Sequence, residues 1–159
     1  MKSAIAFIAA FAALGSAAYA KPNVQLKLDG ELAHRDAKGV VTFVPVAGLA
    51  LKPGDTVRYD IVATNQGTDP AKTLMPMGKV PSGTAYEAGT ASATGALRVE
   101  FSLDGGKTWA VTPTVRVQTP AGVVEQKADP ARYTMVRWIG GKPLEPHTAA
   151  TYSYEVRVK

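Results

Sequence analysis

The chain has 159 residues, of which 46% are hydrophobic and 19% are charged, and its 18 basic against 13 acidic residues give a net charge of +5. Opposite charges are interspersed and no basic run occurs, which argues against nucleic acid as a partner. The absence of cysteine excludes disulfides, thiolate metal ligands and thiol catalysis.

Residues 1–20 match a secretory signal peptide. Lys2 precedes an apolar run from Ala4 to Leu14, and Ala18-Tyr19-Ala20 provides the small-residue cleavage pattern before Lys21. The alternative, a membrane anchor, would need about 20 consecutive apolar residues. We therefore expect cleavage after Ala20 and an exported protein, periplasmic or extracellular at the cell surface, with no membrane insertion after cleavage.

Residues 21–159 are expected to form one domain, long enough to bury a core. Apolar residues alternate with polar ones from Val24 to Leu28, which predicts a first strand that continues towards Arg35, with a turn or bulge at Asp29-Gly30. A hairpin loop at 36–39 leads to a return strand at 40–46. Pro45 cannot donate a ladder hydrogen bond, so this strand should be an edge or should end at that point.

The longest strand signal begins after a turn at Pro53-Gly54. Four alternating residues predict a half-buried strand: Val57, Tyr59, Ile61 and Ala63. Asn65-Gln66-Gly67 is expected to end this strand with residues that tolerate turns.

Further strands are predicted at 71–79, 84–86, 96–103, 132–139 and 151–158. In the first of these, Leu74 and Met77 are core candidates, and Pro76 suggests an edge or a bulge. A turn at 104–107 should lead back into residues 108–111, and another turn is expected at 120–122.

These elements predict an all-β fold. After residue 20 no segment shows a sustained helical period, and about seven to nine short strands with turns between them favour an Ig-like antiparallel β-sandwich. An up-and-down barrel is the main alternative.

Two motifs carry a family resemblance: Pro53-Gly54-Asp55-x-Val57-x-Tyr59-x-Ile61 with Asn65-x-Gly67, and Val80-Pro81-x-Gly83-Thr84. Residues 49–159 resemble the Ig-like repeat of bacterial and archaeal surface proteins known as domain-of-unknown-function family eleven. Met77-Gly78-Lys79 departs from the Asp-x-Leu that such repeats often carry before the second motif. The resemblance implies a secreted or surface β-sandwich, commonly one repeat of a larger surface protein, and implies no chemistry.

A further motif, in a different part of the chain, matches the Asp-box of sialidases and related propellers at every position: Ser102, Asp104, Gly106, Thr108 and Trp109. In propellers this box is a hairpin corner that repeats once per blade, but here it occurs once and the chain is too short for a typical propeller. We interpret it as a structural turn. Carbohydrate chemistry and a turn that contacts glycans are the alternatives.

Methionine and histidine raise the question of copper in an exported protein. The candidates are Met75, Met77, His34 and His147, although both methionines suit core or rim packing equally well. Neither histidine lies in a recognisable catalytic motif. We therefore expect no cofactor, no metal and no enzymatic activity.

The leading functional hypothesis is an exported, non-enzymatic domain with a structural or adhesive role, contacting another cell-envelope protein or its own copies. Prolines 45 and 76 should blunt the sheet edges and favour a soluble monomer unless a partner covers them. One alternative is a periplasmic copper-binding protein. Another is a carbohydrate-binding module, which requires exposed aromatic residues: Trp109, Trp138, Tyr152 and Tyr154.

Overall fold

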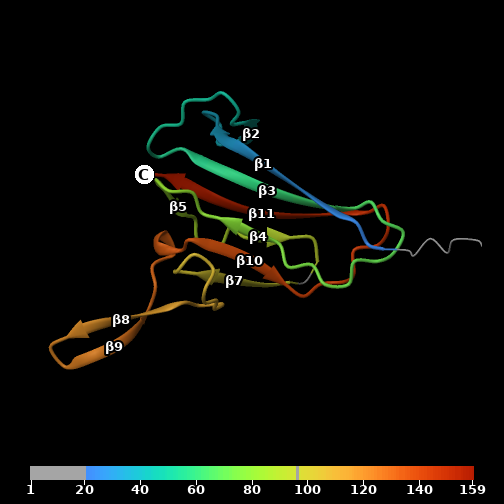
Figure 1. Cartoon of the computed structure of the whole chain (residues 1–159). Helices are drawn as coiled ribbons and strands as arrows, with labels where there is room; N and C mark the ends of the chain where they lie inside the picture. The colour runs from blue at the N-terminus through green and yellow to red at the C-terminus, as the bar shows by residue number, and fades with distance from the viewer. Residues whose placement is uncertain (1–20, 96) are drawn as a thin grey trace, which may run out of the picture.

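The computed structural model describes residues 21–95 and 97–159, and the predicted signal peptide lies outside these residues. Its larger sheet has the strand order β2-β1-β3-β11-β5, with β6 paired to β11, and every pairing is antiparallel (Figure 1). The strands are β1 (Val24–Arg35), β2 (Val41–Pro45), β3 (Thr56–Asn65), β5 (Thr84–Tyr86), β6 (Ser92–Ala93) and β11 (Ala149–Val158).

The second sheet has the order β4-β10-β7 and packs on the first. Its strands are β4 (Met77–Lys79), β7 (Arg98–Ser102) and β10 (Met135–Ile139). The predicted antiparallel β-sandwich is confirmed. Eleven strands lie within the described residues, more than expected, and three of them, β4, β5 and β6, are only two or three residues long.

The core lies between the two sheets, where the predicted alternation places its apolar residues. Val57, Ile61 and Ala63 of β3 are buried, while the residues between them are partly exposed. Trp138 of β10 packs on β11, with ring centroids 5.6 Å from Tyr152 and 6.2 Å from Tyr154. These contacts join the sheets across their centre.

The expected turn or bulge at Asp29-Gly30 is wrong. Both residues lie inside β1, opposite Asp60 and Tyr59 of β3. A Cβ atom at Gly30 would lie 3.0 Å from Cγ2 of Val46. Glycine therefore serves close packing inside a continuous strand here rather than a turn.

Only the end of the predicted strand 71–79 forms a strand. Ala71 makes an isolated bridge with Leu144, and β4 begins at Met77. Leu74 is partly buried against the core, as expected, but Met77 is 52% exposed and is not a core residue.

Asn65 is not a simple turn residue, because its side chain is fully buried at the end of β3. Its Nδ2 donates to the carbonyl oxygens of Asp69 (2.8 Å) and Leu144 (2.9 Å). Its Oδ1 accepts from the backbone N–H of Gly67 (3.0 Å) and of Asn23 (3.3 Å). Asn65 thus ties three chain segments together at one end of the sandwich.

The predicted turn at 120–122 joins the two strands of a hairpin. The hairpin consists of β8 (Thr114–Thr119) and β9 (Gly122–Lys127) and projects from the sandwich (Figure 1). A single 3₁₀ turn, η1 (Pro130–Arg132), leads from it towards β10.

Candidate interaction groove

The five Asp-box residues meet in one turn after β7. The Asp104 carboxylate accepts hydrogen bonds from the Ser102 hydroxyl (2.7 Å), the Thr108 hydroxyl (2.7 Å) and the backbone N–H of Thr108 (2.9 Å). These donors hold the pKa of Asp104 well below its usual range, the Thr108 hydroxyl most strongly. The Trp109 indole N–H donates to the carbonyl oxygen of Gly106 (2.9 Å) and closes the turn.

The turn is also fixed to the outer face of the smaller sheet. The Arg137 guanidinium lies over the Trp109 ring, 4.4 Å from its centroid, and its Nη2 is 2.6 Å from the Glu100 carboxylate. The side-chain polar groups of Ser102, Asp104, Thr108 and Trp109 all form hydrogen bonds within the turn, which fits the structural interpretation of the motif.

The structure does not bring the four metal candidates together. His34 lies near one end of β1, opposite Thr42. His147 lies near the other end, because its backbone N–H donates to Asn65, which pairs with Val24. Ten residues of strand separate the two ends, about 33 Å. The two histidines therefore cannot bind one ion.

Met75 and Met77 are both about half exposed, at 48% and 52%. Within residues 21–95 and 97–159, no group of three or more histidine, aspartate or glutamate side chains is placed to hold a metal ion.

Three of the four aromatic residues that a carbohydrate platform would need are in the core. Trp138, Tyr152 and Tyr154 are at most 5% exposed, and Trp109 is covered by Arg137. These side chains cannot form a surface on which sugar rings stack, so the geometry does not support a module of that kind.

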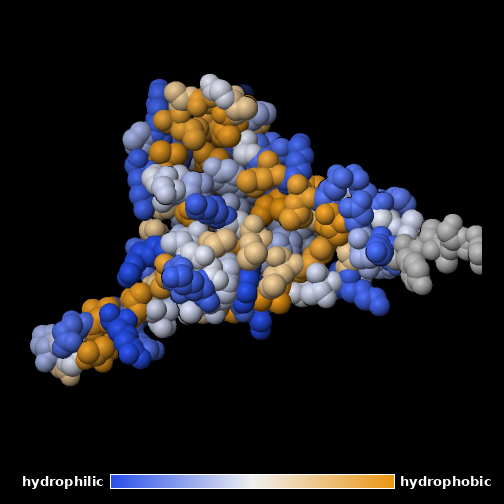
Figure 2. Space-filling view, viewed as in Figure 1, coloured by the Kyte–Doolittle hydropathy of each residue, from blue (hydrophilic) through white to orange (hydrophobic). Residues whose placement is uncertain are grey.

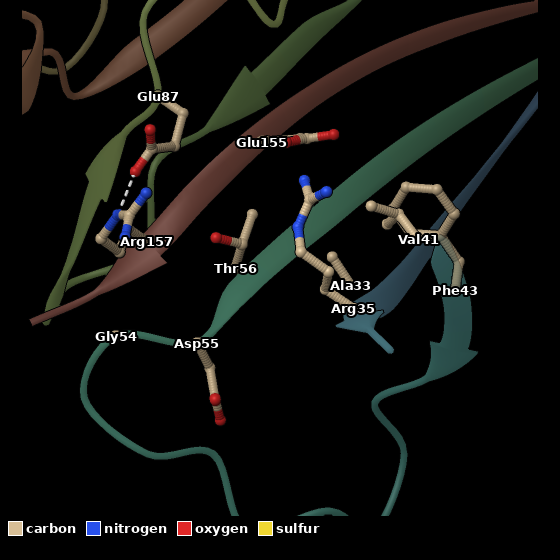
Figure 3. A pocket seen from close by; sticks show the side chains of 10 residues that line it. All are labelled: Ala33, Arg35, Val41, Phe43, Gly54, Asp55, Thr56, Glu87, Glu155 and Arg157. Atoms are coloured by element: carbon tan, nitrogen blue, oxygen red, sulfur yellow. Dashed lines mark hydrogen bonds and ion pairs between the residues drawn. The ribbon is translucent and has the colours of Figure 1, made fainter. Parts of the chain in front are cut away.

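A polar cleft of about 540 Å³ lies on the outer face of the larger sheet, at the end where β3 begins (Figure 3). Its charges are largely committed to the fold. Arg157 pairs with Glu87, and Arg35 donates to the carbonyl oxygen of Gly39 (2.8 Å). The Asp55 carboxylate accepts from the backbone N–H of Lys52 (2.7 Å), within the turn that begins β3.

A second, apolar groove lies between β1 and β4 and has a volume of about 490 Å³. Leu26 and Leu28 of β1 form one wall, with exposed fractions of 62% and 61%, and Met77 lies on the other. Tyr59 and Ile61 of β3 lie between them. Figure 2 shows apolar atoms continuing along this part of the molecule.

The groove exists because the two sheets have unequal widths. Leu26 and Leu28 pair with Ala63 and Ile61, so they face the inner side of the larger sheet. The smaller sheet ends at β4, which packs on Tyr154 of β11 and does not extend over β1. The inner face of β1 is therefore left without a covering strand.

The wall formed by β4 is a free sheet edge. Val80 donates its N–H to Thr134, and the carbonyl oxygen of Pro76 accepts from Trp138, so even-numbered residues pair with β10. The backbone groups of Met77 and Lys79 consequently face away from β10. The Lys79 carbonyl accepts from the Tyr154 hydroxyl (2.7 Å), and β4 pairs with no further strand among the described residues.

This geometry determines whether Pro76 removes a hydrogen-bond donor from the free edge of β4. The proline lacks an N–H that would have faced β10, so it does not remove a donor from the free edge. The expectation that Pro76 blunts the edge is wrong for the free edge of β4. Pro45, in contrast, ends the edge strand β2 as predicted.

Sequence reasoning did not identify this groove. The alternation of Leu26 and Leu28 with polar residues indicated a strand with an apolar face, but it did not show that the opposite sheet leaves this face open. The residues that line the groove come from four separate strands, β1, β3, β4 and β11, and from the loop after β4, and no local motif links them.

Comparison of this chain with known family models, with curated proteins and with solved structures gives no match. The resemblance to the Ig-like surface repeat thus stays a prediction. Among the described residues, no helix is both long enough and apolar enough to span a membrane.

Proposed function

We propose that this protein is an exported, non-enzymatic domain of the cell envelope whose role is structural or adhesive. It binds another protein through the groove between β1 and β4. The carrying observation is the open inner face of β1, where Leu26 and Leu28 are each more than 60% exposed beside the free edge of β4.

Apolar contact and free backbone groups occur together here. Single exposed leucines are common on protein surfaces, but Leu26, Leu28 and Met77 are neighbours in one groove with Tyr59 and Ile61 beneath them. A protein partner can cover the apolar side chains and satisfy the strand edge at the same time. The predicted signal peptide supports an envelope location.

Site-specific photo-crosslinking tests this proposal. A photoreactive amino acid at Leu28 should form protein adducts in the envelope of the producing cell. The matched control is Val123 on the projecting hairpin, which has the same exposed fraction as Leu26, 62%, but lies outside the groove.

Adducts formed from position 28 and not from position 123 would support the groove as an interaction site. Equal adducts from both positions, or none from position 28, would refute it.

A further inference from the structure

The occupant of the groove can be specified further, on the basis of the proposed function. We infer that the groove between β1 and β4 binds an extended polypeptide segment of another protein, which adds as a strand to β4 and carries acidic side chains among alternating apolar ones.

Strand addition follows from the backbone of β4. The smaller sheet stops one strand short of β1, and the outward groups on its edge belong to Met77 and Lys79. An added strand would lie about 4.8 Å from β4, over Tyr59 and Ile61 of β3 and beside Leu26 and Leu28 of β1. Every second side chain of such a strand would then point at Leu26 and Leu28, which requires apolar residues with a period of two.

The acidic character follows from the charges at the groove. Its lining includes Lys27 and Lys79 and no carboxylate. Lys27 alternates with Leu26 and Leu28, so its side chain lies on the outer face of the sheet, where it pairs with Asp29 (3.0 Å). Lys79 forms no ion pair within the described part of the chain. The chain as a whole is also cationic, at +5. A carboxylate of the bound segment near Lys79 would form an ion pair with its ammonium group, which favours association with acidic partners.

A second copy of this chain fits less well. The apolar element that projects from a second copy is the β8–β9 hairpin, in which Val123 is 62% exposed and which carries Arg116 and Lys127 against a single carboxylate, Glu125. This excess of positive charge does not match the positive charge of Lys79 at the groove. A lysine on an edge strand is also a common device against self-pairing.

The test is a selection from a displayed library of random segments of about seven residues, enough to span 75–81 at roughly 3.3 Å per residue. The bait is the mature chain, 21–159. We expect enriched peptides with apolar residues at alternate positions and aspartate or glutamate between them. Leu28→Lys should weaken their binding at least about tenfold, and Val123→Lys should leave it unchanged.

Two further variants separate strand addition from simple apolar contact. Lys79→Glu should reverse the preference from acidic to basic peptides. Methylation of alternate backbone nitrogens in a selected peptide should abolish binding in one register, where the N–H groups face β4, and leave it within about threefold in the other.

Several results would overturn the inference: no enrichment, peptides without alternation, binding that ignores Leu28→Lys or Lys79→Glu, or equal effects of both methylation registers. Self-association of the chain that Leu28→Lys abolishes would identify a second copy as the occupant instead. The proposed function has a separate test. Photo-crosslinks from position 28 to a protein would still support it if the peptide library yielded no peptides of the expected pattern.

Discussion

Gly78 of β4 lies directly on the ring of Tyr154, so closely that a Cβ atom at position 78 would overlap Cε1 of the tyrosine. The Tyr154 hydroxyl donates a 2.7 Å hydrogen bond to the carbonyl oxygen of the next residue, Lys79. This contact holds β4 against β11 and sets the position of the groove wall.

Gly78→Ala should destabilise the protein by about 1–3 kcal/mol, because the new methyl group must displace a buried ring. Guanidinium unfolding measures the change in the free energy of unfolding. Ser82→Ala, in the exposed loop that follows β4, is the control and should change the stability by less than about 0.5 kcal/mol. Equal effects of the two substitutions would contradict the packing described for Tyr154.

Stability should fall in alkaline solution. Burial raises the pKa of Tyr59, Tyr86, Tyr133, Tyr152 and Tyr154. The unfolded chain therefore loses tyrosine protons first, from about pH 10. The stabilisation is fully present below that pH and is lost as the pH rises towards the folded-state pKa values.

Unfolding curves between pH 8 and 11 check this prediction. Tyr154→Phe should make the loss of stability in alkaline solution less steep, because burial strongly raises the pKa of Tyr154. A stability that stays constant across the range would contradict it.

Asn65→Ala should cost about 3–5 kcal/mol, because it leaves buried donors and carbonyl oxygens without partners in three chain segments. Asn23→Ala is a matched control, since Asn23 is exposed and takes part through its backbone N–H alone. Denaturant unfolding of both variants provides the measurement, and a loss below about 1 kcal/mol for Asn65→Ala would be inconsistent with the observed network.

Asp104→Asn should loosen the turn after β7. Hydrogen bonding lowers the pKa of Asp104, so its stabilising effect is present above the unfolded value, near pH 3.9, and is lost as the pH falls through the folded value. Amide exchange at Thr108 should accelerate in the variant at neutral pH and in the unmodified protein only in strong acid. Asp29→Asn, which removes a surface ion pair, should leave Thr108 unaffected.

The strands that could be predicted are those in which local alternation coincides with burial. Val57 to Ala63 and Tyr152 to Val156 follow a period of two, and the structure buries the expected residues except Tyr59, which is partly exposed in the groove. Gly30 was misread because a glycine beside aspartate resembles a turn, whereas the cause is the approach of Val46 and Tyr59 from other parts of the chain. Such contacts leave no local signal.

The candidate site could not be predicted for a related reason. Alternation shows which face of β1 is apolar, but the width of the opposite sheet decides whether Leu26 and Leu28 become core or surface. The smaller sheet stops at β4, whose position depends on Gly78 and on the distant Tyr154. The Asp-box, by contrast, was recognisable because its hydrogen bonds lie within eight residues.

Amide hydrogen exchange along β4 tests most directly whether its edge is open for a partner. In the mature chain, the N–H of Val80 should be protected by its bond to Thr134, whereas the N–H groups of Met77 and Lys79 should exchange rapidly at every protein concentration. Protection of Met77 and Lys79 equal to that of Val80 would show that the edge is already covered, and would contradict the account of this groove as a free binding site.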